Sequence, residues 1–194
     1  MPDDEVRGHG ALTAALLVAS PRLDDPNFNR TVVLVLDHGE EGALGVVLNR
    51  PTSLDVSEIL EPWQDAAAAT PPATVFRGGP VSPDAVIGLA RAAHPPRVDE
   101  RWRSLLGPVG TVDLGVAPED QPVALDAIRL FAGYAGWTTG QLEAEIEEGG
   151  WFVVDARPDD VFSTDPERLW HDILRRQGGE LGLLAGYPPH PSLN

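Results

Sequence analysis

The chain has 194 residues, of which 42% are hydrophobic, a size and composition that suit one domain with a packed core. Its 14 basic residues are outnumbered by 30 acidic ones, and the net charge of -16 disfavours non-specific binding to nucleic acid, which depends on neutralising backbone phosphates. All 14 basic residues are arginine, and the lack of lysine excludes a P-loop lysine and Schiff-base catalysis. Cysteine is also absent, which excludes disulfides, zinc–thiolate sites and cysteine nucleophiles.

The N-terminal segment lacks the pattern of a targeting signal. Residues 1–10 are acidic and predict a disordered start, whereas residues 11–194 predict a single domain. The apolar run Ala11–Ala19 follows three acidic residues and one arginine, which is the wrong charge for a secretory signal. No apolar run approaches the roughly 18 residues of a membrane span. We therefore expect a cytoplasmic protein without membrane association.

Strands and turns alternate through the first half of the chain. A continuous apolar run predicts that 31–36 is a central strand buried on both faces, and 43–49 returns from it as the second strand of a hairpin. Asp55 and Glu58 have the spacing of a capping box and predict a short helix. The other strands predicted in this half are 16–19, 74–77 and 85–91, and the predicted surface loops are 61–73 and 92–104.

The next predicted elements lead into a glycine-rich stretch. Residues 111–117 predict a strand, 119–127 a short helix, and the alternating residues 128–132 a further strand. Gly133 and Gly136 follow at once, and glycine adopts backbone angles that a Cβ atom would penalise. We therefore predict a sharp corner at these glycines, where the strand ends, and expect alanine at either position to be strained.

A helix is predicted directly after this corner. Thr138 and Gln141 have capping-box spacing, and Trp137 with Leu142 could form a hydrophobic staple. Gly140 would lie in the first helical turn, where alanine is expected to be neutral or stabilising. A helix N-terminus can bind phosphate, but four glutamates on this helix weigh against that use. We interpret the corner as structural, with a ligand-binding turn as the alternative.

The C-terminal part predicts one more strand and one more helix. Residues 151–156 have the composition of a strand, and the helix begins near Thr164, which has capping-box spacing to Glu167, and ends at Gly178. Strands and helices do not alternate regularly along the chain. The sequence therefore predicts a mixed α+β fold.

Three motifs in this order resemble the AlgH/YqgE family of bacterial proteins. They are SPRLDDPNFNRTVVLVLDHGEEGALGVVLNRP (20–51), FRGGPV (76–81) and GYAGWTTGQLEAEI with GGWFV (133–153), followed by Trp170 and the terminal PSLN. The resemblance covers about residues 12–194. It implies a mainly antiparallel, bifurcated sheet, partly closed like a barrel and surrounded by helices. It implies no catalytic residues and no cofactor, and only the label of a transcriptional regulator that some members carry.

Candidate binding residues lie at the glycine-rich turns and beside them. Two glycines can expose backbone amides, and with Arg77 they could hold a carboxylate or phosphate, although the same residues form an ordinary sharp turn. Arg50 ends a strand and could equally form a structural ion pair. The predicted ligand or partner surface consists of Asn49, Arg50, Arg77, Gly78, Gly79, Tyr134, Trp137 and Gln141.

Catalytic and metal-binding patterns are missing from the sequence. No two histidines have the spacing His-x-x-x-His, and His171 beside Asp172 is interpreted as a surface residue. No Gly-x-Ser-x-Gly elbow supports a serine nucleophile. We therefore predict no catalytic residue, metal or cofactor, which favours a non-enzyme over an unrecognised enzyme without deciding between them.

Two classes of function remain open. The first, which we favour because no catalytic pattern emerges, is a non-enzymatic interaction or regulatory protein that binds an unknown protein partner through a surface around Tyr134, Trp137 and the two glycine turns. The second is a protein that binds a small anion, or an unrecognised enzyme, using the arginines and the glycine turns. A cleft lined by Arg50 and Arg77 together with perturbed carboxylates would favour the second class, and a flat apolar patch would favour the first. Direct DNA regulation comes third, because no basic helix accompanies a helix-turn-helix pattern.

Overall fold

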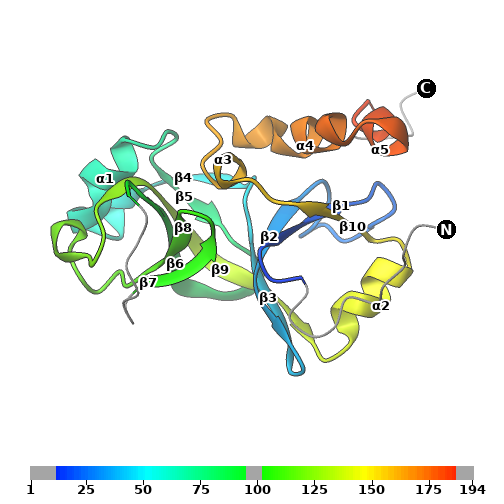
Figure 1. The fold of residues 1–194 in the computed structure, drawn as a ribbon, viewed down its shortest axis with the longest axis horizontal. Coiled ribbons are helices and arrows are strands. Elements are labelled where there is room, and N and C mark those ends of the chain that lie inside the picture. The colour runs from blue at the N-terminus through cyan, green and yellow to red at the C-terminus, as the bar shows by residue number, and fades with distance from the viewer. Residues whose placement is uncertain (1–11, 95–101, 187–194) are drawn as a thin grey trace.

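One branched sheet organises the whole fold. The computed structural model describes residues 12–94 and 102–186, so the predicted disorder of residues 1–10 lies outside the described residues. Ten strands form the sheet, and short helices lie around it (Figure 1). The branch lies at β9 (Leu125–Thr138), which pairs antiparallel with β6 and β3 and parallel with β5. The predicted α+β class, with a mainly antiparallel bifurcated sheet curled into a half-barrel, is confirmed.

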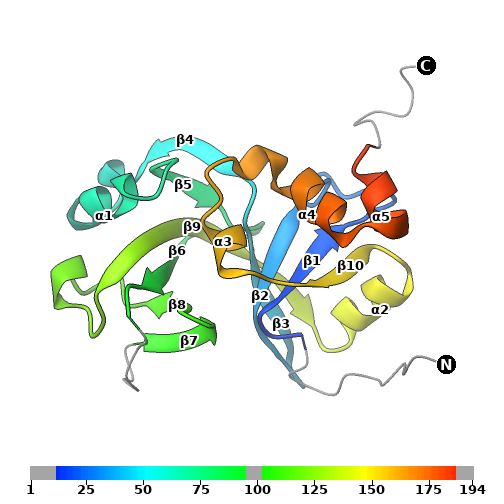
Figure 2. The same cartoon turned by 45° about the horizontal axis from the view of Figure 1, so that its top comes forward.

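The first arm of the sheet holds four antiparallel strands in the order β10-β1-β2-β3. They are β1 (Ala15–Ala19), β2 (Val32–Gly39), β3 (Gly42–Val47) and β10 (Trp151–Asp155). One face packs on α4 (Leu169–Gln177), which α5 (Gly179–Leu184) follows, and the other packs on α2 (Gln141–Glu147), as Figure 2 shows. Because both faces are covered, residues 32–35 have no exposed surface, and the predicted central strand is confirmed.

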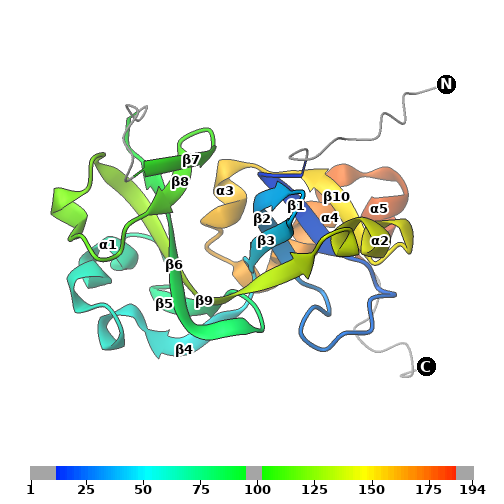
Figure 3. The same ribbon diagram turned by 90° about the horizontal axis from the view of Figure 1, so that it is seen from below.

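The second arm is more strongly curved and holds the remaining strands. They are β4 (Pro51–Asp55), β5 (Thr74–Arg77), β6 (Val81–Ala92), β7 (Trp102–Leu106) and β8 (Val109–Val112). Figure 3 shows β9 running from this arm into the first. The largest core cluster contains residues of both arms, among them Leu34 of β2 and Phe76 of β5. None of the helices in residues 12–94 and 102–186 is both long and apolar enough to cross a membrane.

Several local predictions are confirmed by side-chain contacts. The Asp55 carboxylate accepts from the Ser57 amide at 2.8 Å, and Glu58 accepts from the Asp55 amide at 3.1 Å, which completes the predicted capping box of η1 (Val56–Glu58). The helix predicted to end at Gly178 is present as η4 (Pro166–Arg168) and α4. Its start differs, because Asp165 occupies the N-cap position and no side chain caps it.

Two predicted surface loops contain regular structure. The stretch 61–73, predicted as a loop from its prolines, forms η2 (Glu61–Trp63) and α1 (Gln64–Ala68). The prediction is wrong because Trp63 and Ala67 are buried in the core of the second arm, where tertiary packing stabilises a helix too short to form alone. In the stretch 92–104, residues 95–101 lie outside the described residues, and β7 begins at Trp102.

The elements around β9 also differ from the prediction. The strand predicted at 111–117 ends at Val112, and the helix predicted at 119–127 is limited to η3 (Pro118–Asp120). The helix is cut short because Leu125 pairs with Ala92 of β6 and so begins β9. A further short helix, α3 (Pro158–Val161), was not predicted.

The predicted corner at Gly133 and Gly136 is wrong. Strand β9 continues through both glycines to Thr138, and the chain turns only at Gly140, which has a positive φ of 73° and precedes α2. Gly133 has a φ of 70° and lies opposite an irregular register of β6, where a Cβ atom would approach the Val81 carbonyl oxygen to 2.9 Å. A Cβ atom on Gly136 would meet Tyr134 at an ordinary 3.6 Å.

We expect these three glycines to respond differently to alanine. Gly133→Ala should lower the free energy of unfolding by about 1–3 kcal/mol through strain, and Gly140→Ala by about 1 kcal/mol because its φ is positive. Gly136→Ala should change it by less than about 0.5 kcal/mol and serves as the control. Urea denaturation of the three variants measures the effects. A wild-type midpoint for Gly133→Ala would contradict the role of its backbone angle.

Candidate functional site

Two of the predicted binding residues, Arg50 and Arg77, lie side by side where β4 meets β5. The Arg77 amide donates to the Arg50 carbonyl oxygen at 2.8 Å. Both side chains line a cavity of about 40 Å³, which we call the arginine pocket. Its lining residues are Pro26, Asn27, Val47, Arg50, Arg77, Gly79 and Pro80.

The guanidinium group of Arg50 is held by backbone oxygens. Its Nη2 donates to the Asn29 carbonyl and its Nη1 to the Asn49 carbonyl at 3.5 Å. The structural ion pair considered for Arg50 is not found, since no carboxylate among the described residues pairs with Arg50 or Arg77. Burial lowers the pKa of Arg50, and the positive charge of Arg77 lowers it further. The pocket therefore holds two like charges without a counter-charge.

Asn49 and the two glycines support the pocket from behind. The buried Asn49 side chain accepts from the Val32 amide at 2.9 Å and donates to the Arg30 carbonyl at 2.8 Å. The Gly78 amide donates to the Ala132 carbonyl at 2.8 Å and is not available to a ligand, contrary to one reading of this turn. A Cβ atom on Gly79 would lie 2.1 Å from the Tyr134 backbone, so this residue is glycine because β9 passes so close.

Trp137 and Gln141 belong to a separate cluster under α2. Trp137 is 6% exposed, and its indole N–H donates to Glu145 Oε2 at 2.9 Å. The Trp151 indole donates to the same oxygen at 2.8 Å, and the Gln141 amide donates to Glu145 Oε1 at 3.0 Å. Phe28 packs on both indoles. Trp137 and Leu142 share this core, but the predicted capping box and staple are wrong, because Gly140 and not Thr138 is the N-cap of α2 and no side chain caps the helix. The predicted binding surface is thus divided between the arginine pocket and this cluster, in which Trp137 is buried and Gln141 is exposed.

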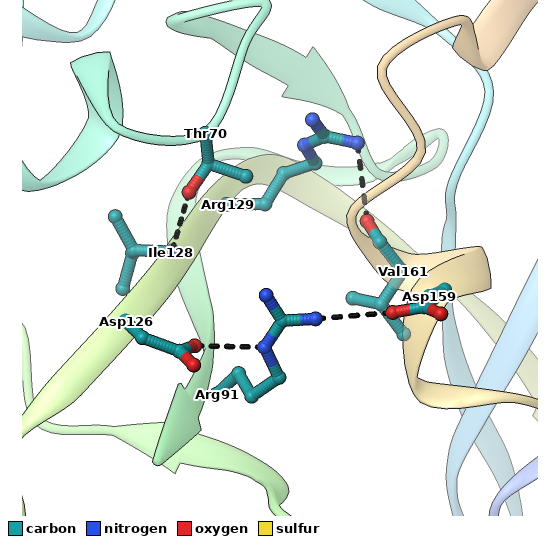
Figure 4. Close-up of polar contacts among 7 residues, drawn as sticks. All are labelled: Thr70, Arg91, Asp126, Ile128, Arg129, Asp159 and Val161. Atoms are coloured by element: carbon teal, nitrogen blue, oxygen red, sulfur yellow. Dashed lines mark hydrogen bonds and ion pairs between the residues drawn. The ribbon is translucent and has the colours of Figure 1, made fainter. Parts of the chain in front are cut away.

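A crevice with paired charges was not predicted from the sequence. Arg91 of β6 donates to Asp126 of β9 at 2.7 Å and to Asp159 of α3 at 3.1 Å (Figure 4). Its guanidinium also lies 5.4 Å from the centre of the Phe162 ring. Cavities of about 390 and 430 Å³ flank Arg91, and both are lined by Arg91 and Asp126. Because Arg91 is already neutralised by two carboxylates, the crevice presents no uncompensated positive charge.

Arg129 lies above this crevice and is almost fully buried. Its guanidinium donates to three backbone carbonyls, those of Val161 at 3.1 Å, Ser163 at 2.9 Å and Pro71 at 2.9 Å. It also lies 4.4 Å from the centre of the Phe76 ring. Burial lowers its pKa to about 10, so it remains charged at neutral pH. Arg129 therefore connects β9 to two loops and is a structural residue.

Metal-binding and histidine chemistry are limited in the described part of the chain. Residues 12–94 and 102–186 contain no group of three histidine or carboxylate side chains that could hold a metal ion. His38 Nε2 lies 2.8 Å from Glu143 Oε1 and joins β2 to α2. His171, predicted to lie on the surface, is partly buried, with Nδ1 2.7 Å from the Ala185 carbonyl oxygen.

Comparison with known proteins gives consistent matches over almost the whole chain. The model of the family described as AlgH-like matches residues 16–182. The chain is 56% identical to a UPF0301 protein of Streptomyces avermitilis over 95% of its length and 96% of the relative. It is 41% identical to a UPF0301 protein of Mycobacterium tuberculosis over 100% of its length and 96% of that relative.

Two solved structures resemble the fold. The crystal structure of a protein from Corynebacterium diphtheriae matches with a TM-score of 0.82 and 32% identity, over 96% of this chain and 95% of that one. The solution structure of the AlgH protein from Pseudomonas aeruginosa matches with a TM-score of 0.64 and 30% identity, over 98% of this chain and 100% of that one. The names of these similar proteins state no activity.

Proposed function

The chain belongs to the AlgH-like family, and from this premise we propose that it is a non-enzymatic, cytosolic interaction protein that binds a partner through the arginine pocket. The partner would present an acidic group to Arg50 and Arg77. A regulatory role of the kind that the family label suggests would follow from such binding.

One observation carries this proposal. Arg50, directly before β4, and Arg77, at the end of β5, are joined by a backbone hydrogen bond of 2.8 Å, and their like charges repel each other. The chain has 30 acidic residues, yet no described carboxylate neutralises the pair. Proteins depart from such local rules mainly at functional sites, where a ligand supplies the missing interaction.

Binding without chemistry is the better supported of the two classes. The pocket is lined by both arginines, as the second class requires, but its lining contains no carboxylate that could act as an acid or base. The carboxyl group of Asp55, whose pKa is lowered by hydrogen bonds from Ser57, is not part of the pocket. Binding of a small free anion remains the alternative function, because the same two charges would attract it.

Affinity capture from native cytosol tests the proposal. The wild-type chain, Arg50→Gln/Arg77→Gln and the control Arg168→Gln/Arg175→Gln, which removes two exposed arginines of the α4 region, are used as baits. Mass spectrometry then identifies the captured proteins and small molecules. We expect one set to be captured by the wild type and the control but lost from the pocket variant, with circular dichroism confirming that all three are folded.

Two results would count against this function. Identical captured sets from all three baits would show that the arginine pocket is not the binding surface. Sub-micromolar binding of the wild type to random duplex DNA at about 0.15 M salt would favour a nucleic-acid partner, which the charge of -16 disfavours.

A further inference from the structure

The arginine pocket has a charge and a size that together define a ligand class. We infer that it is a receptor for one phosphate monoester group carried on a larger molecule. This inference rests on the proposed function and names the acidic group that the partner presents.

The charge of the pocket matches a dianion. Arg50 and Arg77 contribute two positive charges, and no described carboxylate cancels either one. A phosphate monoester carries a charge of about -1.5 to -2 at pH 7, whereas a single carboxylate carries only one negative charge. A carboxylate would therefore leave one guanidinium without a counter-charge, and a phosphate monoester would neutralise both.

The size of the pocket admits a head group and little else. Its volume is about 40 Å³, which exceeds the roughly 10–15 Å³ that one water requires. Sites for whole drug-sized molecules usually measure about 300–1,000 Å³. The rest of the ligand must therefore lie outside the pocket.

The guanidinium group of Arg50 is positioned before any ligand arrives, whereas the side chain of Arg77 is exposed. Arg50 donates to the carbonyls of Asn29 and Asn49, and the hydrogen bond from the Arg77 amide to the Arg50 carbonyl fixes the two backbones relative to each other. Arginine forms two parallel hydrogen bonds to phosphate oxygens, and ordering it in advance reduces the entropy lost on binding. The pocket therefore presents one ordered and one exposed guanidinium group to an oxyanion.

Titration of the isotopically labelled full chain with small anions, followed by NMR, tests this inference. The probes are methyl phosphate, sulfate and acetate, each at about pH 7.5 and about pH 5, on either side of the phosphate monoester pKa of about 6. At the higher pH, methyl phosphate and sulfate should shift the Gly79 amide and the Arg50 Nε–H signals, and acetate should bind at least about tenfold more weakly. At the lower pH, methyl phosphate is protonated to a monoanion, so its binding should become weaker. Sulfate remains a dianion, and its binding should not change.

Two variants separate a specific site from general attraction. Arg77→Gln should weaken binding of methyl phosphate at least about tenfold, because about 1.4 kcal/mol corresponds to a factor of ten and a charged hydrogen bond contributes that much or more. Arg103→Gln on β7 removes the same charge from an exposed ion pair and should leave binding unchanged. Equal loss in both variants, acetate binding as tight as methyl phosphate, or no binding of either dianion would overturn the inference.

The source of the phosphate is decided by a second pair of probes. A phosphoserine peptide and glycerol phosphate carry the same head group on a protein-like and on a small-molecule body. Tighter binding of either one than of methyl phosphate supports the inference and identifies the source. If both bind more weakly than methyl phosphate, the ligand does not extend beyond the head group and the inference is wrong. Affinity capture could still succeed in that case, since a partner can bind the same arginines through carboxylates.

Discussion

Arg129→Ala is expected to lower the free energy of unfolding by at least about 3 kcal/mol, because the buried, charged guanidinium group makes three hydrogen bonds and bonds to charged groups contribute about 1.5–3 kcal/mol each. The guanidinium group donates to the carbonyls of Pro71, Val161 and Ser163, and its removal leaves all three unpaired. It also empties the space beside the Phe76 ring. Urea denaturation monitored by circular dichroism measures the loss.

The matched control for this prediction is Arg103→Ala. Arg103 forms an exposed ion pair with Asp37 at 3.0 Å, and such pairs contribute about 0–1 kcal/mol. If Arg129→Ala lowered the free energy of unfolding by no more than this control, the hydrogen bonds of Arg129 would not stabilise the fold.

The pH dependence of Arg129 gives an independent check. Its folded pKa of about 10 is lower than that of the unfolded chain, so burying the charge costs stability at every pH below about 10. That cost falls as the pH rises above about 10. The stability difference between the wild type and Arg129→Ala should therefore be constant from about pH 6 to about pH 9.

Trp137→Ala is expected to lower the free energy of unfolding by about 3–5 kcal/mol, the usual range for removing a buried tryptophan. Its indole lies 6.1 Å from that of Trp151 and 6.3 Å from the Phe28 ring, measured between ring centres. The variant would open a cavity between α2 and the first arm. Chemical denaturation gives the size of the loss, and the near-ultraviolet circular dichroism of the aromatic cluster should weaken.

Trp137→Phe distinguishes packing from hydrogen bonding at this position. It keeps an aromatic ring but loses the N–H that donates to the Glu145 carboxylate, so it should lower the free energy of unfolding by about 1.5–3 kcal/mol plus a smaller packing loss. Glu145 retains the hydrogen bond from Trp151. An unchanged midpoint for Trp137→Ala would mean that Trp137 contributes no packing and would return it to the candidate binding surface.

The first arm was the most predictable part of the fold. Its strands are continuous apolar runs, and the residues that were predicted as a strand at 31–36 are buried on both faces, so local composition reflects the final environment. The second arm was less predictable. Trp63 holds a short helix in place only through contacts with distant strands, and Gly133 is accommodated in β9 only because β6 pairs irregularly opposite it. Such contacts between distant residues leave no pattern in the local sequence from which they could be predicted.

The candidate site was predictable in part for the same reason. Arg50 lies between β3 and β4 next to a proline, and Arg77 ends β5 next to a glycine, positions that drew attention in the sequence. Arg91 gave no such signal, since its partners Asp126 and Asp159 lie 35 and 68 residues away. Arg129 alternates with apolar residues as a solvent-facing residue would, and only the loops of Pro71 and Val161 bury it.

The position of β1 between β2 and β10 has a consequence for how the chain folds. Ala15 pairs with Asp155, so the edge of β1 stays open until most of the chain has been synthesised. The β2–β3 hairpin can form early from neighbouring residues, but closing the distant pair requires a large loss of chain entropy. During that interval the apolar segment Ala15–Ala19 presents unpaired backbone groups on a ribosome-bound intermediate. Folding should therefore be slow at its last step, and a nascent chain that stalls before Trp151 would be prone to aggregate or to require a chaperone.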